Sequence, residues 1–136
     1  MGSNGNWTGQ TATGTNSDWS GGALTFGVAS APWALAKYAV TTICVGDTST
    51  LTDSDGSFLV SVVQNNQAGD PNEGTGLSIV VGNLRPGDAL TLDSRETFFI
   101  SLLSIRPVLS DGTTTDTSAA LNYHLQGHTS SHRATV

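Results

Sequence analysis

The chain has little positive charge. It contains one lysine and four arginines against eleven acidic residues, so its net charge is −6. The basic residues are scattered along the sequence at Lys37, Arg85, Arg95, Arg106 and Arg133. Binding to nucleic acid requires several basic side chains on one surface, because phosphate contacts supply most of the affinity. We therefore expect no direct nucleic-acid partner.

The chain also lacks a second cysteine and a long hydrophobic run. Cys44 cannot form an intrachain disulfide, and it lies in the apolar run 40–45, where we expect it to be buried as a small hydrophobic side chain. No run approaches the roughly 20 apolar residues of a membrane-spanning helix, and the N-terminus has no basic, apolar leader. We expect no membrane partner and no secretion signal.

Motifs of enzymes are missing as well. The sequence contains no G-x-S-x-G, no phosphate-binding loop and no H-E-x-x-H. The stretch 53–57 begins like a calcium-binding loop, but its twelfth position is Gln64, whereas such loops end on a bidentate glutamate. We interpret this stretch as a turn. We expect no catalytic residues, no cofactor and no enzymatic activity.

The three histidines leave one alternative open. His124, His128 and His132 recur every fourth residue. A helix or an extended chain would place them on one side, where symmetry-related copies could gather them around a metal ion. The glycine, serines and threonine between them favour a solvated tail instead, so we expect no metal site.

What the chain does contain is the pattern of β-strands. β-Branched and aromatic residues form short runs, and helical spacing is confined to one turn near 32–36. We expect strands at 23–29, 37–45, 57–64, 77–81, 89–93, 97–105 and 119–125. Turn residues separate them at 53–56, 85–88 and 111–112. This spacing predicts an all-β domain over 23–126, an antiparallel β-sandwich or jelly roll.

The strand expected at 97–105 is apolar on both faces, whereas 119–125 alternates between apolar and polar residues. In a sandwich one face of a strand normally meets water, so the second apolar face of 97–105 needs a cover. We expect another subunit to provide it through Phe99 and Leu103. The alternative is a central strand covered by a loop of the same chain.

The first 22 residues are polar and nearly uncharged. They are rich in glycine, threonine, serine and asparagine, with two tryptophans, Trp7 and Trp19. Such a segment cannot offset its own ordering entropy by burying apolar surface. We therefore expect an extended N-terminal arm over 1–22 that lies on a neighbouring subunit, with Trp7 and Trp19 as its anchors. Residues 127–136 are expected to form a loose tail.

In size, composition and arm the whole chain resembles the decoration, or cement, proteins of tailed-phage capsids. The resemblance rests on no motif. It implies a structural viral protein on the outer capsid surface of the virion, a trimer, and the major capsid protein as partner. Two alternatives remain. One is a carbohydrate-binding β-sandwich, such as a head-fibre or lectin-like domain, with Trp7, Trp19, Trp33 or Tyr38 stacking on sugars. The other is a self-assembling coat subunit.

Overall fold

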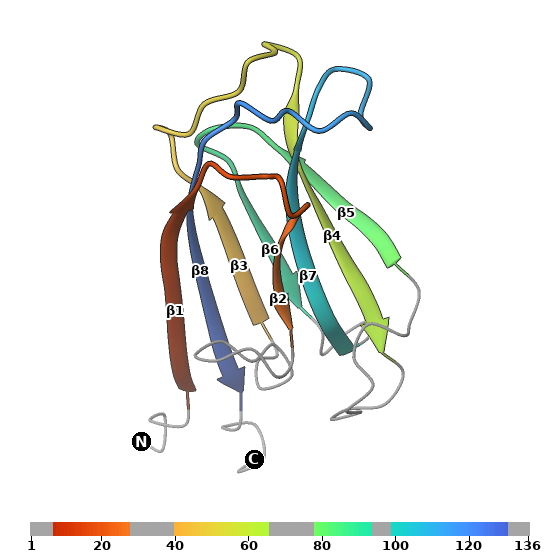
Figure 1. Ribbon diagram of the computed structural model, residues 1–136. Coiled ribbons are helices and arrows are strands. Elements are labelled where there is room, and N and C mark those ends of the chain that lie inside the picture. Colours follow the sequence, from red (N-terminus) through yellow and green to blue (C-terminus); the bar gives the residue numbers. More distant parts are fainter. Residues whose placement is uncertain (1–6, 28–39, 66–77, 94–98, 131–136) are drawn as a thin grey trace.

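Eight strands form two antiparallel sheets that lie face to face (Figure 1). The computed structural model describes residues 7–27, 40–65, 78–93 and 99–130, and within them there is no helix. In spatial order the first sheet contains β1 (Trp7–Asn16), β8 (Leu121–Ser130), β3 (Val40–Val45) and β6 (Ala89–Asp93). The second contains β2 (Leu24–Gly27), β7 (Phe99–Val108), β4 (Ser57–Asn65) and β5 (Ser78–Leu84). The expected all-β sandwich is confirmed; the helical turn expected near 32–36 lies outside the described residues.

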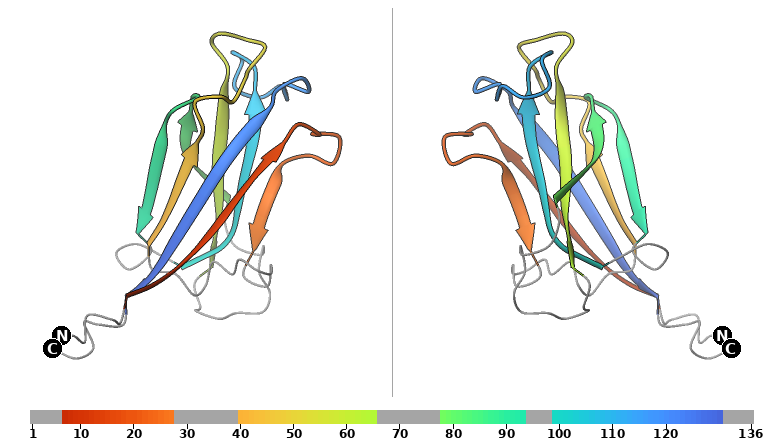
Figure 2. Two further views of the ribbon diagram at one scale, coloured as in Figure 1. Left: turned by 90° about the vertical axis from the view of Figure 1, so that its left-hand side faces the viewer. Right: turned by 90° about the vertical axis from the view of Figure 1, so that its right-hand side faces the viewer.

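The strands pair as one long hairpin that is rolled up. β4 pairs with β5, β3 with β6, β2 with β7 and β1 with β8. Pairing of β3 with β8 and of β4 with β7 completes the two sheets, which gives an eight-stranded jelly roll. Four connections, 17–23, 46–56, 85–88 and 109–120, therefore lie together at one end, which we call the loop end (Figures 1 and 2). The start of β1 and the end of β8 lie at the other.

Alternate residues of the strands fill the space between the sheets. The expected alternation in β8 is confirmed, because Leu121 and Leu125 are fully buried while Asn122 and His124 are half-buried. The same period of two operates in β3 and β4. The fully buried side chains include Ile43, Val45, Phe58, Val60, Val62, Leu103, Ile105, Leu121 and Leu125.

The segment expected to be an arm forms part of this sandwich. β1 pairs with β8 along its whole length, from Trp7 opposite Ser130 to Asn16 opposite Leu121. Ala12 packs against the core, and the exposed threonines of β1 alternate with it. The prediction of an extended arm is therefore wrong for the described residues of 1–22. In the same way residues 127–130 belong to β8, not to a tail. Small inward residues in place of large apolar ones conceal β1 from sequence analysis.

Trp19 lies in the core of its own domain. Its side chain is 4% exposed, and the indole N–H donates a hydrogen bond to the carbonyl of Ala119 at 2.9 Å. Its neighbours in sequence are polar, but it belongs to a core cluster whose other members lie on strands and loops farther along the chain. The expected role of Trp19 as an anchor on a neighbouring subunit is therefore wrong, because the same chain already buries the indole.

Leu103 also faces the core and is fully buried. β7 is a central strand, and its register against β4 shifts, with Val63 opposite Leu102 and Gln64 opposite Ile100. The expected subunit contact through Leu103 is wrong, and the alternative of a central strand covered within the chain applies to this residue.

The turns expected at 85–88 and 53–56 are confirmed. The N–H of Asp88 donates to the carbonyl of Arg85 at 2.9 Å, and Gly87 has φ +93°, as a type II turn requires. The N–H of Gly56 donates to the carbonyl of Asp53 at 3.0 Å. Position 56 needs glycine because a β-carbon there would lie 2.6 Å from the carbonyl oxygen of Val108.

Replacement of Gly56 by alanine should lower the free energy of unfolding by about 1–3 kcal/mol, because the backbone at Val108 has to move to admit the methyl group. Gly21→Ala is the matched control, since nothing lies within 4 Å of a β-carbon at Gly21. Urea unfolding measures both variants. Equal stability of the two would contradict the close approach of the two chain segments.

Replacement of Trp19 by alanine should destabilise the isolated domain by about 3–5 kcal/mol, because it leaves a cavity in the core and removes the hydrogen bond to Ala119. Trp19→Phe keeps most of the buried ring and should cost less. Thermal unfolding of the pure protein distinguishes this from an anchor role. If Trp19 were only an anchor on another subunit, Trp19→Ala would leave the melting temperature of the isolated domain unchanged.

Candidate binding surfaces

Negative charge is concentrated at the loop end. Seven aspartates lie there: Asp18, Asp47, Asp53, Asp55, Asp88, Asp111 and Asp116. The basic residues within the described ranges are Arg85, in a loop, and Arg106, in β7, whose guanidinium reaches the 109–120 loop. The loop end therefore carries net negative charge, which disfavours an anionic partner there.

Several of these carboxylates fasten the loops to one another. Asp53 accepts hydrogen bonds from the N–H of Asp55 and from the N–H of Ser110, both at 2.9 Å. Asp116, 3% exposed, accepts from the N–H of Thr52 at 2.8 Å and from the N–H of Ser118 at 3.2 Å. Both aspartates thus join loop 46–56 to loop 109–120. Their role is structural, and no sequence motif indicated it.

Hydrogen bonds also keep some of these groups ionised in acid. Asp111 accepts from the hydroxyl of Thr114 and from the N–H groups of Thr113 and Thr114, at 2.9 and 2.8 Å. These bonds favour the charged form, with the hydroxyl as the largest cause, and lower the pKa of Asp111 to about 2. The N–H groups of Asp55 and Ser110 lower the pKa of Asp53 in the same way. The loop end therefore stays negative well below neutral pH.

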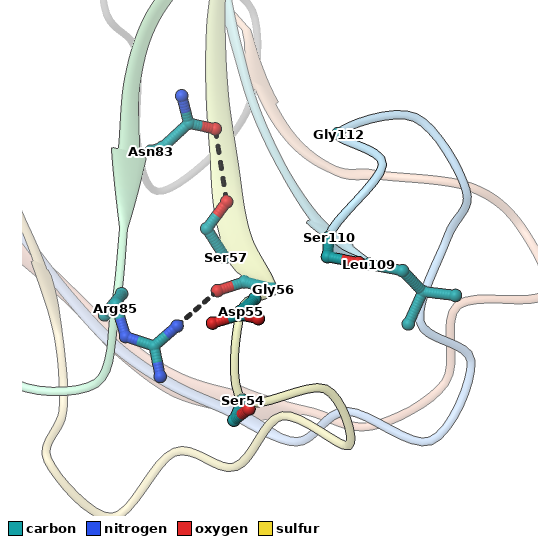
Figure 3. A pocket seen from close by; sticks show the side chains of 9 residues that line it. All are labelled: Ser54, Asp55, Gly56, Ser57, Asn83, Arg85, Leu109, Ser110 and Gly112. Atoms are coloured by element: carbon teal, nitrogen blue, oxygen red, sulfur yellow. Dashed lines mark hydrogen bonds between the residues drawn. The ribbon is translucent and has the colours of Figure 1, made fainter.

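A polar hollow of about 630 Å³ opens among these loops (Figure 3). Arg85 crosses it, and its Nη1 donates to the carbonyl of Gly56 at 2.6 Å. The hydroxyl of Ser57 donates to Oδ1 of Asn83 at 3.2 Å. The described lining comprises Ser54, Asp55, Gly56, Ser57, Asn83, Arg85, Leu109, Ser110 and Gly112. The hollow therefore combines loop residues with the adjacent ends of β4 and β5.

The chemistry of this hollow is hydrogen bonding. The hydroxyl of Ser57 is hydrogen-bonded to the side-chain amide of Asn83. The nine lining residues include neither a histidine that could act as a base nor a cysteine that could act as a thiol nucleophile. The serine hydroxyls, Asp55, Asn83 and Arg85 match the hydroxyl groups of a sugar. The same nine residues include no aromatic ring, so they do not provide the stacking platform of many sugar sites.

The second candidate surface is the outward face of the first sheet. Its described side chains include no Asp, Glu, Lys or Arg: Thr11, Thr13, Thr15, Thr42, Cys44, Ala89, Thr91, Asn122, His124 and Gln126. Hydrogen bonds link neighbouring strands across it, from Thr13 Oγ1 to His124 Nδ1 at 2.8 Å and between the hydroxyls of Thr42 and Thr91 at 3.1 Å. A shallow hollow of about 360 Å³ lies around Cys44 and His124. This surface is polar, and its described side chains include no carboxylate, lysine or arginine.

Cys44 lies on this outward face and not in the core. Its neighbours Ile43 and Val45 are buried, so strict alternation turns the half-buried thiol outward, opposite His124. The expectation of a buried cysteine is wrong, because the apolar run is a strand with one wet face. His128 lies in β8 opposite Gly9, and His132 is outside the described residues. In the part of the chain that the structure describes, no three His, Cys, Asp or Glu side chains are grouped for a metal.

The four residues expected to contact a partner do not form one surface. Trp19 and Leu103 belong to the same core cluster. Trp7 is the first residue of β1 and Phe99 the first of β7, where it pairs with Asn65. The side chains of Trp7 and Phe99 lie outside the described residues.

The lowered pKa of Asp111 predicts a pH dependence. The folded state holds this carboxylate ionised more strongly than the unfolded state, so its contribution to stability is full above the ordinary pKa of 3.8 and is lost as pH falls toward about 2. We expect the stability difference between the wild type and Asp111→Asn to be largest above pH 5 and to shrink toward pH 2. Melting temperatures across this range measure it. Asp47→Asn is the control, because no described group donates a hydrogen bond to that carboxylate; a shrinking difference in both variants would contradict the assignment.

Comparisons with known proteins add no relative to this picture. No protein-family model matches the chain, and a search of curated proteins finds no match. Among the residues whose structure is described, none forms a helix long and apolar enough to cross a membrane. The likeness to decoration proteins is therefore a resemblance in size and composition. The two features of the molecule that bear on function are the polar hollow at the loop end and the outward face of the first sheet.

Proposed function

We propose that the chain is a structural subunit that binds the outer surface of a viral capsid and stabilises it, as decoration proteins of phage shells do. One observation carries the proposal: a four-stranded sheet presents a polar outward face whose described side chains include no Asp, Glu, Lys or Arg. The jelly roll adds an analogy of architecture, since viral capsid and lectin domains use this fold. The virion surface would be its location and the major capsid protein its partner.

The outward face of the first sheet suits such a contact. Threonine hydroxyls together with Asn122 and Gln126 offer donors and acceptors across all four strands, and no described carboxylate, ammonium or guanidinium group has to be desolvated when a partner covers them. The exposed aspartates of the loop end, such as Asp47 and Asp111, would stay in solvent. Neither the arm nor Trp19 enters this proposal, and the trimer implied by the resemblance is not required by it.

Binding of this kind stabilises a shell without chemistry. A protein that binds the assembled lattice but not the free subunits shifts the assembly equilibrium toward the lattice by mass action. Many identical sites on one particle multiply a modest contact. No group beyond those on the outward face is needed for this activity.

The polar hollow in Figure 3 favours a second candidate, a carbohydrate-binding domain. Arg85, Asn83 and Asp55 border it with groups that bond hydroxyls. Trp19, one of the rings expected to stack on sugars, is buried in the core. A sugar site would therefore depend on hydrogen bonds at the loop end.

Sedimentation with empty phage shells that lack their own decoration proteins tests the first candidate. We expect the pure chain to co-sediment with a matching shell and to raise its disruption temperature. Thr91→Arg on the outward face of β6 should weaken binding, because the bulky cation disturbs a flat uncharged contact. Thr25→Arg on β2 of the second sheet is the matched control, since both threonines are exposed on edge strands.

Two results would oppose the capsid assignment. The first is no binding to any shell of a broad panel. The second is an equal loss of shell binding in Thr91→Arg and Thr25→Arg, which would place the contact away from the outward face. Binding to a glycan array that is abolished by Asn83→Ala would favour the carbohydrate candidate instead.

A further inference from the structure

The four edges of the two sheets are not equally protected. An edge strand exposes unpaired N–H and C=O groups, and proteins shield such edges by shortness, bulges, proline or charge. β2 has 4 residues and β6 has 5, whereas β5 has 7 and shifts its register opposite Val60 and Ser61. β1, at the outside of the first sheet in Figure 1, has 10 residues and pairs with β8 without a shift. It is the longest of these edges and has no bulge.

The composition of β1 offers no protection either. Its sequence, WTGQTATGTN, contains no charged residue and no proline. Within the described ranges β1 pairs with β8 alone, so its other side is open. The devices that normally keep a sheet edge from pairing with another chain are therefore absent from β1.

The hydrogen bonds of β8 show which groups of β1 face that open side. The carbonyl of Asn122 accepts from the N–H of Gly46 at 2.7 Å, so Asn122 turns its backbone groups toward β3. Backbone groups of successive residues in an antiparallel strand point to opposite sides. Tyr123 and Leu125 therefore turn theirs toward β1.

The partners of Tyr123 and Leu125 in β1 are Gly14 and Ala12. The backbone groups of these two residues are thus used in pairing with β8. The residues that alternate with these two are Thr11, Thr13 and Thr15, and they turn their N–H and C=O groups to the open edge. Their side chains are exposed as well. The open edge is a row of alternating donors and acceptors bordered by hydroxyl groups.

We infer that β1 pairs with β1 of a second copy of this chain, antiparallel and about a two-fold axis. A row of alternating donors and acceptors is complementary to itself, and two uncharged strands approach without repulsion. The two-fold contact closes both open edges, so assembly stops at a dimer. This inference does not rest on the proposed function.

The position of the negative charge favours the same arrangement. β1 ends at the loop end, where the aspartates gather. Antiparallel pairing sends the loop ends of the two copies to opposite ends of the dimer, so the two negative regions stay apart. Parallel pairing would place them side by side.

One register keeps edge-facing residues opposite one another over nearly the whole strand. It is centred on Ala12 and places Thr11 opposite Thr13 of the second copy. Threonine pairs across antiparallel strands are stabilising contacts. The joined first sheets would then form one continuous sheet through both copies.

Sedimentation equilibrium of the full chain over a range of concentrations tests the inference, and we expect a dimer. Thr13→Pro should be monomeric and still folded, because proline is tolerated where the N–H faces away from the neighbouring strand. Ala12→Pro should instead lower the melting temperature, because it removes a bond to β8. Thr13→Lys should weaken the dimer at least about tenfold, since it adds charge to the paired edge. Thr91→Lys, on the opposite edge of the same sheet, is the control and should remain dimeric.

A monomer or a trimer of the wild type at every concentration would overturn the inference. So would a dimer that survives Thr13→Lys, because the contact would then lie elsewhere. If Thr13→Pro fails to fold, the comparison of Thr13→Lys with Thr91→Lys decides the question. Loss of the dimer in Thr13→Lys with retention in Thr91→Lys supports the edge contact.

Discussion

The first sheet depends on the two-sided pairing of β8. This strand lies between β1 and β3, and its successive residues turn their backbone groups alternately to one neighbour and the other. Its odd-numbered side chains, Leu121 and Leu125 among them, fill the core at the same time. β8 therefore holds both neighbouring strands by its backbone and the second sheet by its side chains. Removal of its pairing would release β1 altogether, because β1 has no other described partner strand.

The loop end is organised by a different interaction, hydrogen bonding from backbone N–H groups to carboxylates. Asp53 and Asp116 join two loops, and Asp111 orders the turn that follows it. These three aspartates are among the eleven acidic residues of the chain. Their charge is therefore part of the scaffold, whereas most described side chains of the outward face of the first sheet form no hydrogen bond to the loops; Asn122, which donates to Thr48, is the exception. This division is the reason for placing the proposed contact on the sheet.

Sequence analysis predicted the fold class and seven of the strands because those strands are short runs of β-branched and other apolar residues separated by turn residues. It missed β1, since alanine and glycine at inward positions give no apolar signal. It misplaced Trp19 because the core that buries this ring comes from residues about a hundred positions away, such as Ala119. It misread Leu103 and Cys44 for related reasons: a side chain of a central strand can be covered by its own chain, and an apolar run can still have a wet face. Neither candidate surface has a local motif, because each is assembled from several strands or loops.

The pairing of β1 with β8 has a consequence for synthesis of the chain. β1 is made first among the described strands and β8 last, so β1 has no neighbour in its sheet until the ribosome has produced nearly all of the domain. Contacts between such distant segments also slow folding in general. A strand of large apolar residues would be exposed to aggregation during this interval. β1 consists mainly of threonine, glycine and other small or polar residues, so it presents little apolar surface while it waits. The composition that conceals the strand from sequence analysis therefore also suits its late incorporation.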